Sequence, residues 1–196
     1  MMIEPAGSPG STPLTAEEGD DLIPYVANRG QLNRLEQSNI IEAERWAFSR
    51  RRTDLLSLDF MHGLHRRMFG EVWRWAGNFR SSNKNIGDVD STHVPTQLQG
   101  LNDDTKYWLV QETYPPDEIA ARFHQRLTWI HPFPNGNGRH ARLMTDLLLV
   151  QMDRPRFTWG AGKDLAAAGV VRASYLEALR RADQQDFTPL LEFARS

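Results

Sequence analysis

The sequence contains no cysteine, which excludes disulfide bonds, thiolate metal sites and thiol nucleophiles. A chain without disulfides suits a reducing compartment, so we expect a cytoplasmic protein. The sequence also lacks any apolar run near the roughly 20 residues that a membrane-spanning helix needs, so we expect no membrane association. The N-terminus has neither a basic region nor an apolar segment, and we expect no secretory signal there.

An excess of positive charge is missing as well. The formal net charge is −2 at pH 7, and the basic clusters are short and scattered. Because nucleic-acid binding usually needs a basic face, we expect no direct binding to DNA or RNA. Every charged residue before Arg29 is acidic, and the first twenty residues are rich in Pro, Gly and Ser. We therefore predict that residues 1–20 form a mobile acidic tail, with a weak helix-start signal at Thr15.

Strand-like alternation of polar and apolar residues is scarce, and helical periodicity dominates the rest of the chain. With 196 residues, 40% of them hydrophobic, the chain can build one substantial core, so we predict a single domain over residues 21–196. The polar, turn-rich segment 75–95 predicts irregular structure or a small β-hairpin. The fold class is therefore mainly α, and the helical patterns lie at about 30–51, 54–73, 97–112, 115–130, up to 152, and 174–183.

One stretch, HPFPNGNGRHAR, concentrates flexible and polar residues directly before the apolar run LMTDLLLV. Gly136 and Gly138 permit a positive φ and a close approach to the backbone, and a helix N-terminus favours a bound anion. Arg139 and Arg142 project from the same side of that first turn, where cations oppose the helix dipole. A phosphate chain would resolve this conflict, and His131 at the other edge of the loop could act as a general base.

The alternative interpretation is an ordinary helix–loop–helix corner with solvated arginines. In that interpretation the glycines serve the turn and the histidine caps a helix C-terminus. Each residue alone fits this alternative well. The convergence of all of them on one helix end favours a phosphate site.

The same stretch resembles the signature of Fic domains, HxFx(D/E)GNGRxxR. The resemblance extends to LHRRMFGEVWRWAGNFR and to YLEALRRAD and FTPLLEF near the C-terminus, so that it covers most of residues 30–193. Within the family, the whole chain is similar to the small subgroup called mobile mystery protein B. The resemblance implies a Fic-type helical bundle with a small β-hairpin flap.

Fic proteins mostly transfer AMP from ATP to a hydroxyl group of a target protein. The resemblance implies that His131 deprotonates this hydroxyl and that Phe133 anchors the loop. It implies that ATP is bound by the residues of the loop and the next helix, namely Gly136, Asn137, Gly138, Arg139 and Arg142. The family's acidic residue, which helps to hold Mg²⁺, is Asn135 here, and an amide oxygen is a weaker ligand for this ion than a carboxylate.

An inhibitory helix is a further expectation, at about residues 30–47. Positions 32, 35, 39, 42 and 46 form one helical seam. Many Fic proteins carry the inhibitory pattern (S/T)xxxE(G/N), which Ser38 to Glu42 match except that alanine follows. The resemblance therefore implies that Glu42 pairs with Arg142 and keeps activity low. The alternative is that Ile40 and Ile41 define another inner face and that Glu42 is solvated.

The segment SSNKNIGDVDSTHVP is the expected target-binding flap, with contacts from Lys84, Asn85 and Ile86, or else an ordinary surface loop. For His62, His65 and His124 we expect packing or surface roles. For partners, self-modification and a homodimer are further possibilities. A toxin–antitoxin-like context is a further expectation. The alternatives to AMP transfer are a nucleotide-binding regulator and another phosphoryl or nucleotidyl transfer, including removal of AMP.

Overall fold

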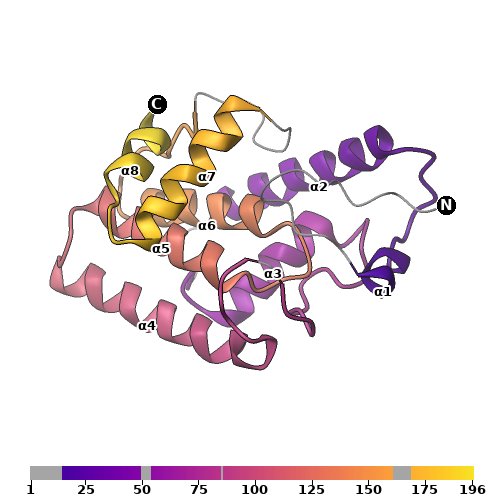
Figure 1. The fold of residues 1–196 in the computed structure, drawn as a ribbon, viewed down its shortest axis with the longest axis horizontal. Coiled ribbons are helices and arrows are strands. Elements are labelled where there is room, and N and C mark those ends of the chain that lie inside the picture. Colours follow the sequence, from indigo (N-terminus) through magenta and orange to yellow (C-terminus); the bar gives the residue numbers. More distant parts are fainter. Residues whose placement is uncertain (1–14, 50–53, 85, 161–168) are drawn as a thin grey trace.

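The computed structural model describes residues 15–49, 54–84, 86–160 and 169–196. Within these residues the regular structure is helical, which confirms the mainly α prediction (Figure 1). The elements are α1 (Ala16–Asp20), α2 (Arg29–Ser49), α3 (Leu58–Phe69), the 3₁₀ helix η1 (Ser91–His93), α4 (Val94–Gln111), α5 (Pro116–Ile130), α6 (Asn137–Gln151), α7 (Val170–Asp183) and α8 (Thr188–Arg195).

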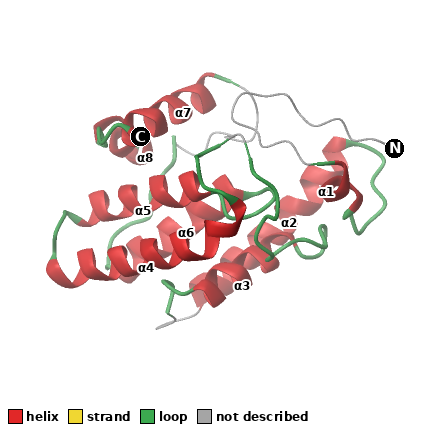
Figure 2. Ribbon diagram, turned by 60° about the horizontal axis from the view of Figure 1, so that its bottom comes forward, coloured by secondary structure: helices red, strands yellow, loops and turns green. Residues whose placement is uncertain are grey.

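Helix α6 is the centre of the bundle. Ten of its 15 residues are buried, and it packs against α2, α3 and α5. Helices α7 and α8 cover one end of the bundle against α5, while α4 lies along its other side (Figures 1 and 2). The loop between α5 and α6 is therefore held by helices whose positions are determined by the core.

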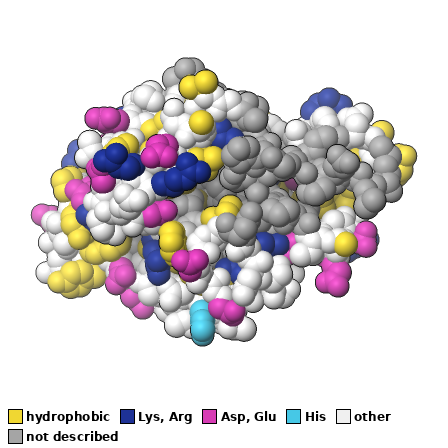
Figure 3. All heavy atoms as spheres, in the orientation of Figure 1, with side chains coloured by type: hydrophobic (Ala, Val, Ile, Leu, Met, Phe, Trp, Pro, Cys, Tyr) yellow, Lys and Arg dark blue, Asp and Glu magenta, His cyan; other side chains and the backbone are white. Residues whose placement is uncertain are grey.

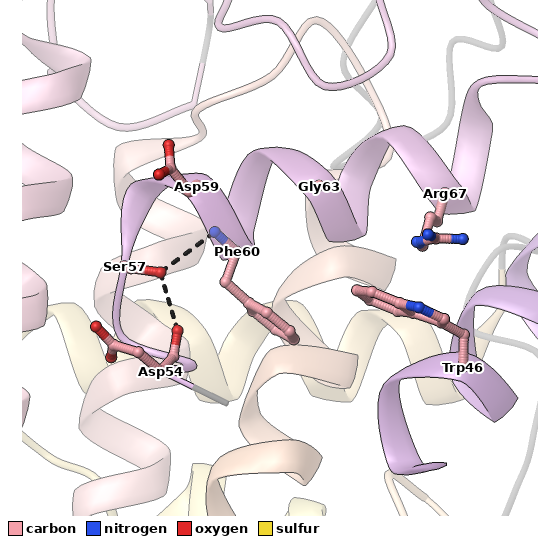
Figure 4. Close-up of a pocket in the computed structure, with 7 residues that line it drawn as sticks. All are labelled: Trp46, Asp54, Ser57, Asp59, Phe60, Gly63 and Arg67. Carbon is pink, nitrogen blue, oxygen red and sulfur yellow. Dashed lines mark hydrogen bonds between the residues drawn. The ribbon is translucent and has the colours of Figure 1, made fainter. Parts of the chain in front are cut away.

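Helical periodicity and capping by side chains account for individual helices. The apolar residues that share one face of α5 all lie in the core with at most 3% exposure, namely Ile119, Phe123, Leu127 and Ile130. At the start of α3, the Ser57 hydroxyl accepts a hydrogen bond from the Phe60 N–H at 3.3 Å and donates to the Asp54 carbonyl at 2.9 Å (Figure 4). These contacts satisfy groups that a helix N-terminus leaves without partners.

A pocket of about 400 Å³ lies between α2 and α3, where the Arg67 guanidinium stands 4.1 Å from the centre of the Trp46 ring (Figure 4). None of residues 131–142, which form the loop after α5 and the first turns of α6, lines this pocket. In the described part of the face shown in Figure 3, basic and acidic side chains are interspersed, as expected of solvated helix surfaces. No helix in the described ranges has the length and apolar character needed to cross a bilayer.

The predicted mobile tail was wrong at its C-terminal end. Residues 1–14 lie outside the described residues, but Ala16–Asp20 form the helix α1. A capping box between Thr15 and Glu18 stabilises its N-terminus. The chain then pairs with the segment after α3, since the Ile23 N–H donates to the Val72 carbonyl at 2.8 Å. The weak start signal at Thr15 therefore marked a real helix.

The predicted β-hairpin flap is not formed in the described part of segment 75–95. Besides η1 and the first two residues of α4, the described part of this segment is irregular, and Arg80 lies buried within it with only 3% exposure. Its guanidinium donates to the carbonyls of Ser82 and Val89. A cation thus binds carbonyl groups that a hairpin ladder would otherwise use, because a buried guanidinium must be satisfied.

Candidate active site

Two residues with positive φ shape the loop between α5 and α6. His131 ends α5 with φ 52°, and Gly136 precedes α6 with φ 78°. A Cβ atom at Gly136 would lie 2.6 Å from ring atoms of Phe69. Only glycine therefore fits this turn, as the sequence predicts. At Gly138 an added Cβ would meet only an ordinary contact at 3.6 Å with Arg142, so packing alone does not require glycine there.

The core holds the loop through Phe133 and Asn137. Phe133 is fully buried, as predicted. The Asn137 side chain accepts from the Phe133 N–H at 2.9 Å and donates to the Phe133 carbonyl at 2.8 Å. Both ends of this buried amide thus fix the loop, and the expected part of Asn137 in binding ATP stays a prediction.

His131 lies at the mouth of this loop with 6% exposure. Its Nδ1 is 3.3 Å from the Thr128 carbonyl, which can only accept, so Nδ1 carries the proton of the neutral ring and Nε2 is the basic nitrogen. Burial lowers the pKa of His131 to about 4; the Thr128 carbonyl opposes this, and the charges of Arg80 and Lys84 add to it. The imidazole is therefore in its base form at neutral pH.

Arg80 is a residue of the site that the sequence analysis missed. Its Nε donates to the His131 carbonyl at 2.8 Å, and its Nη1 donates to the Ser82 carbonyl at 2.8 Å. The side chain therefore ties the segment after α3 to the backbone of the histidine. Nothing in the polar stretch around Arg80 signals burial, since a buried arginine depends on carbonyl groups from distant parts of the chain.

Arg139 pairs with a glutamate of α2. Its Nη1 lies 2.7 Å from Glu36 Oε2, and its guanidinium stands 4.7 Å from the centre of the Phe69 ring. Glu36 is only 7% exposed, and its Oε1 accepts from the Trp73 indole at 2.7 Å. The arginine at the start of α6 is thus held by a carboxylate in the region where the sequence predicts phosphates.

The predicted pair of Glu42 with Arg142 is not formed. Glu42 and Ser38 lie on the exposed face of α2. The buried face instead follows Leu32, Glu36, Ala43 and Ala47. The inner face is therefore rotated away from the predicted seam, because small and aliphatic residues at these positions pack closely against α3 and α6. The spacings of this set, which are four, seven and four residues, were the available signal.

Arg142 lies beside Tyr175 of α7, with its guanidinium 5.8 Å from the ring centre. Burial lowers the pKa of Arg142, and Tyr175 opposes this shift. The Tyr175 hydroxyl is 2.8 Å from Nε2 of His124, whose Nδ1 is 3.2 Å from the Thr145 hydroxyl. Thr145 donates to the Ala141 carbonyl at 2.7 Å, so the His124 proton belongs on Nδ1 and Tyr175 donates to Nε2.

These contacts orient the Tyr175 hydroxyl, which interacts with the guanidinium of Arg142. The expected packing role of His124 thus includes an effect on a site residue.

Asn135 does not supply a metal site by itself. Its side-chain oxygen accepts from the Gly136 N–H at 2.6 Å, and its backbone carbonyl accepts from His65 Nε2 at 3.0 Å. No group of three or more His, Cys, Asp or Glu side chains that could hold a metal occurs among the described residues. Since Mg²⁺ prefers charged oxygen ligands, the side chains present here do not fit it without the oxygens of a nucleotide.

The expected target-binding residues lie near the site but differ in how accessible they are to a target. Lys84 is paired with Glu18 of α1, and Ile86 is half-buried. Asn85 lies outside the described residues. The structure therefore brings the histidine, the glycine turn and both arginines to one corner of the bundle, with Lys84 at its edge.

Comparisons with known proteins agree with this geometry. Residues 55–149 match the model of the Fic/DOC family. The protein adenylyltransferase Fic of Nematostella vectensis is 30% identical over 153 residues, which are 72% of this chain and 32% of the relative. The chain thus spans about a third of the length of this curated relative.

Solved structures show the same fold. Fic-1 (aa134 - 508) from C. elegans matches with a TM-score of 0.63 and 26% identity, over 91% of this chain and 51% of that one. The BepC protein from Bartonella tribocorum, solved with bound AMPPNP, matches with a TM-score of 0.66 and 14% identity over 92% of this chain and 97% of that one. Sequence, geometry and relatives agree that this chain carries a domain of the Fic/DOC family.

Proposed function

We propose that this domain transfers AMP from ATP to a hydroxyl side chain of a target protein. The hydroxyl oxygen attacks the α-phosphorus and forms the new P–O bond, and its proton passes to Nε2 of His131. The bond from the α-phosphorus to the oxygen that bridges to the β-phosphate breaks, and pyrophosphate leaves. Arg139, Arg142 and the backbone N–H groups at the start of α6 stabilise the charge on the phosphates.

The observation that carries this proposal is the placement of a neutral, base-form histidine beside a glycine turn that feeds an arginine-bearing helix N-terminus. A base and an anion site at one helix end are what nucleotidyl transfer to a hydroxyl requires. The name of the Nematostella vectensis relative supports the same reaction.

Incubation with ATP labelled at the α-phosphate or at the γ-phosphate tests the reaction. We expect protein-bound label from α only, with the protein itself or an added lysate as acceptor. Label from γ would indicate a kinase instead. Nucleotide binding without transfer would indicate a regulator, and loss of label from a protein already carrying AMP would indicate the reverse reaction.

For the metal, we propose that Mg²⁺ enters with the nucleotide and is held mainly by phosphate oxygens. Asn135 supports this, since its amide oxygen carries no charge and already accepts from Gly136. Such a metal would neutralise phosphate charge next to the arginines.

We also propose that Glu36, rather than Glu42, restrains the enzyme. While Arg139 is paired with this nearly buried carboxylate, its guanidinium is less available to a phosphate. Glu36→Gln keeps an acceptor for the Trp73 indole and removes the charge. Because a charge-assisted hydrogen bond is worth about 1.5–3 kcal/mol, we expect kcat/KM for ATP to rise roughly 10- to 100-fold in self-labelling assays.

Glu42→Gln is the matched control, because it makes the same chemical change on the exposed face of the same helix. It should leave ATP kinetics unchanged. Activation by Glu42→Gln without activation by Glu36→Gln would contradict this assignment and favour a state in which α2 is rotated.

The target protein, self-modification, a homodimer, a cytoplasmic location and membership of the mobile mystery protein B subgroup stay predictions. So does a toxin–antitoxin-like context.

A further inference from the structure

The Lys84 side chain is almost completely withdrawn from water and is paired with Glu18 of α1. Its ammonium group donates to both carboxylate oxygens of Glu18, at 2.6 and 2.8 Å. The two side chains are only 3% and 12% exposed, respectively. An exposed ion pair of this kind contributes little, but a pair withdrawn from water needs close geometry and further hydrogen bonds.

Glu18 has those further hydrogen bonds. The Ser82 hydroxyl donates to Oε1 at 3.2 Å, and the Thr15 N–H donates to Oε2 at 2.8 Å. The Trp75 indole donates to the Glu18 backbone carbonyl at 3.0 Å. Segment 75–84 therefore forms hydrogen bonds with both the carboxylate and the backbone carbonyl of Glu18.

Helix α1 itself contacts segment 75–84 through polar groups of Glu18, while the residues that follow it are hydrogen-bonded to Val72 and Arg74. It has five residues, none of them buried, and it lies at the edge of the bundle beside the segment that follows α3 (Figure 1). A helix this short is not stable by itself in water, and it has no apolar face that anchors it. A competing chain with equivalent polar groups would therefore need to displace only α1, while Ile23 stays paired with Val72.

The place that Glu18 occupies borders the catalytic base. Arg80 donates both to the His131 carbonyl and to the Ser82 carbonyl, so Ser82 and His131 are held by one guanidinium. Lys84 is close enough for its charge to act on the His131 imidazole. A hydroxyl that reaches His131 thus brings its neighbouring residues close to Lys84 and Ser82.

We propose that Lys84 and Ser82 form a subsite for an acidic side chain of the target protein, and that Glu18 occupies it as an intramolecular substitute. The inference rests on the proposed function and adds the kind of partner: a protein segment with Asp or Glu close to the modified hydroxyl. The segment TAEEGDDL, which contains Glu18, has this composition. Displacement of α1 then accompanies target binding.

A binding measurement tests the subsite independently of catalysis. The probe is a fluorescein-labelled peptide TAEEGDDL, together with an analogue in which glutamine replaces the glutamate equivalent to Glu18. The full-length Glu18→Gln protein should bind the peptide at least tenfold more tightly than its analogue. It should also bind it at least tenfold more tightly than the Glu18→Gln/Lys84→Gln protein does.

The unaltered protein should bind the peptide more weakly than Glu18→Gln, because its own Glu18 competes. Glu17→Gln is the matched control; it alters the exposed neighbour and should behave as the unaltered protein. Thermal melting of each variant checks folding. Equal affinity for peptide and analogue, or equal affinity with and without Lys84, would show that Glu18 only pins α1 and would overturn the proposal.

A second measurement compares AMP transfer to two pools of threonine peptides, one with Glu and one with Gln at the flanking positions. Glu18→Gln should prefer the Glu pool about tenfold in kcat/KM, and Lys84→Gln should lose this preference. Equal use of both pools by Glu18→Gln counts against the subsite. Complete absence of α-label from every variant contradicts the proposed reaction, and the binding measurement then decides the subsite alone.

Discussion

Replacement of His131 by alanine should reduce AMP transfer by a factor of about 10² to 10⁴, the usual contribution of a general base. The Thr128 carbonyl fixes the proton on Nδ1 and leaves Nε2 to accept the proton of the hydroxyl. Initial rates of α-label incorporation measure the loss. His93→Ala is the control, since His93 is an exposed histidine on η1, and it should keep the rate of the unaltered protein.

The pH dependence of the rate checks the same assignment. Because the pKa of His131 is lowered to about 4, the base form persists well below pH 6. We expect no fall of kcat/KM from this group between pH 8 and pH 5.5, measured in short assays where the protein is still folded. A rate that drops with an apparent pKa near 6.5 would show that the base is an ordinary, solvated histidine.

The second large effect concerns acid stability. Four histidines are buried in neutral form: burial lowers the pKa of His124 and of His140 to about 3, that of His131 to about 4, and that of His65 well below its usual value. In the unfolded chain each would titrate near 6.5. Below pH 6.5 the unfolded state binds more protons than the folded state. The free energy of unfolding therefore decreases as the pH is lowered, until the pKa values of the folded state are reached.

Each such histidine costs up to about 1.4 kcal/mol of stability per pH unit in this window. Asp146 acts in the opposite direction, because burial raises its pKa to about 6 and it gains stability as the pH falls. The net loss between pH 7 and pH 5 is then roughly 6 kcal/mol, a large part of the 5–15 kcal/mol typical of folded domains. We expect Tm to drop by roughly 10–20 °C over this range, measured by circular dichroism.

Two variants separate buried from exposed histidines. His140→Gln should flatten the dependence of Tm on pH, because His140 is fully buried, donates to the Met61 carbonyl and leaves Nδ1 without a partner. His93→Gln, at an exposed position, should leave the dependence unchanged. A Tm that stays constant from pH 7 to pH 5 would contradict the burial of these rings.

The positions of most helices could be predicted because helical periodicity and capping are local properties of the chain. The apolar face of α5 and the two prolines near its start predicted that helix to within one residue. The turn at Gly136 was also predictable, since glycine readily adopts a positive φ. The structure adds that a side chain at this position would clash with the Phe69 ring. The predicted flap failed because hydrogen bonds from Arg80 replace the pairing of strands.

The sequence by itself determined the helical class, the loop that carries His131 and the arginines of α6, since these depend on spacing within one segment. Only the tertiary structure decided which glutamate meets an arginine. Glu36 and Glu42 lie on one helix, and neighbouring helices select between them through close packing of Ala43 and Ala47. The same is true of Glu18 on Lys84: an ion pair between residues 66 positions apart depends on the fold that brings them together.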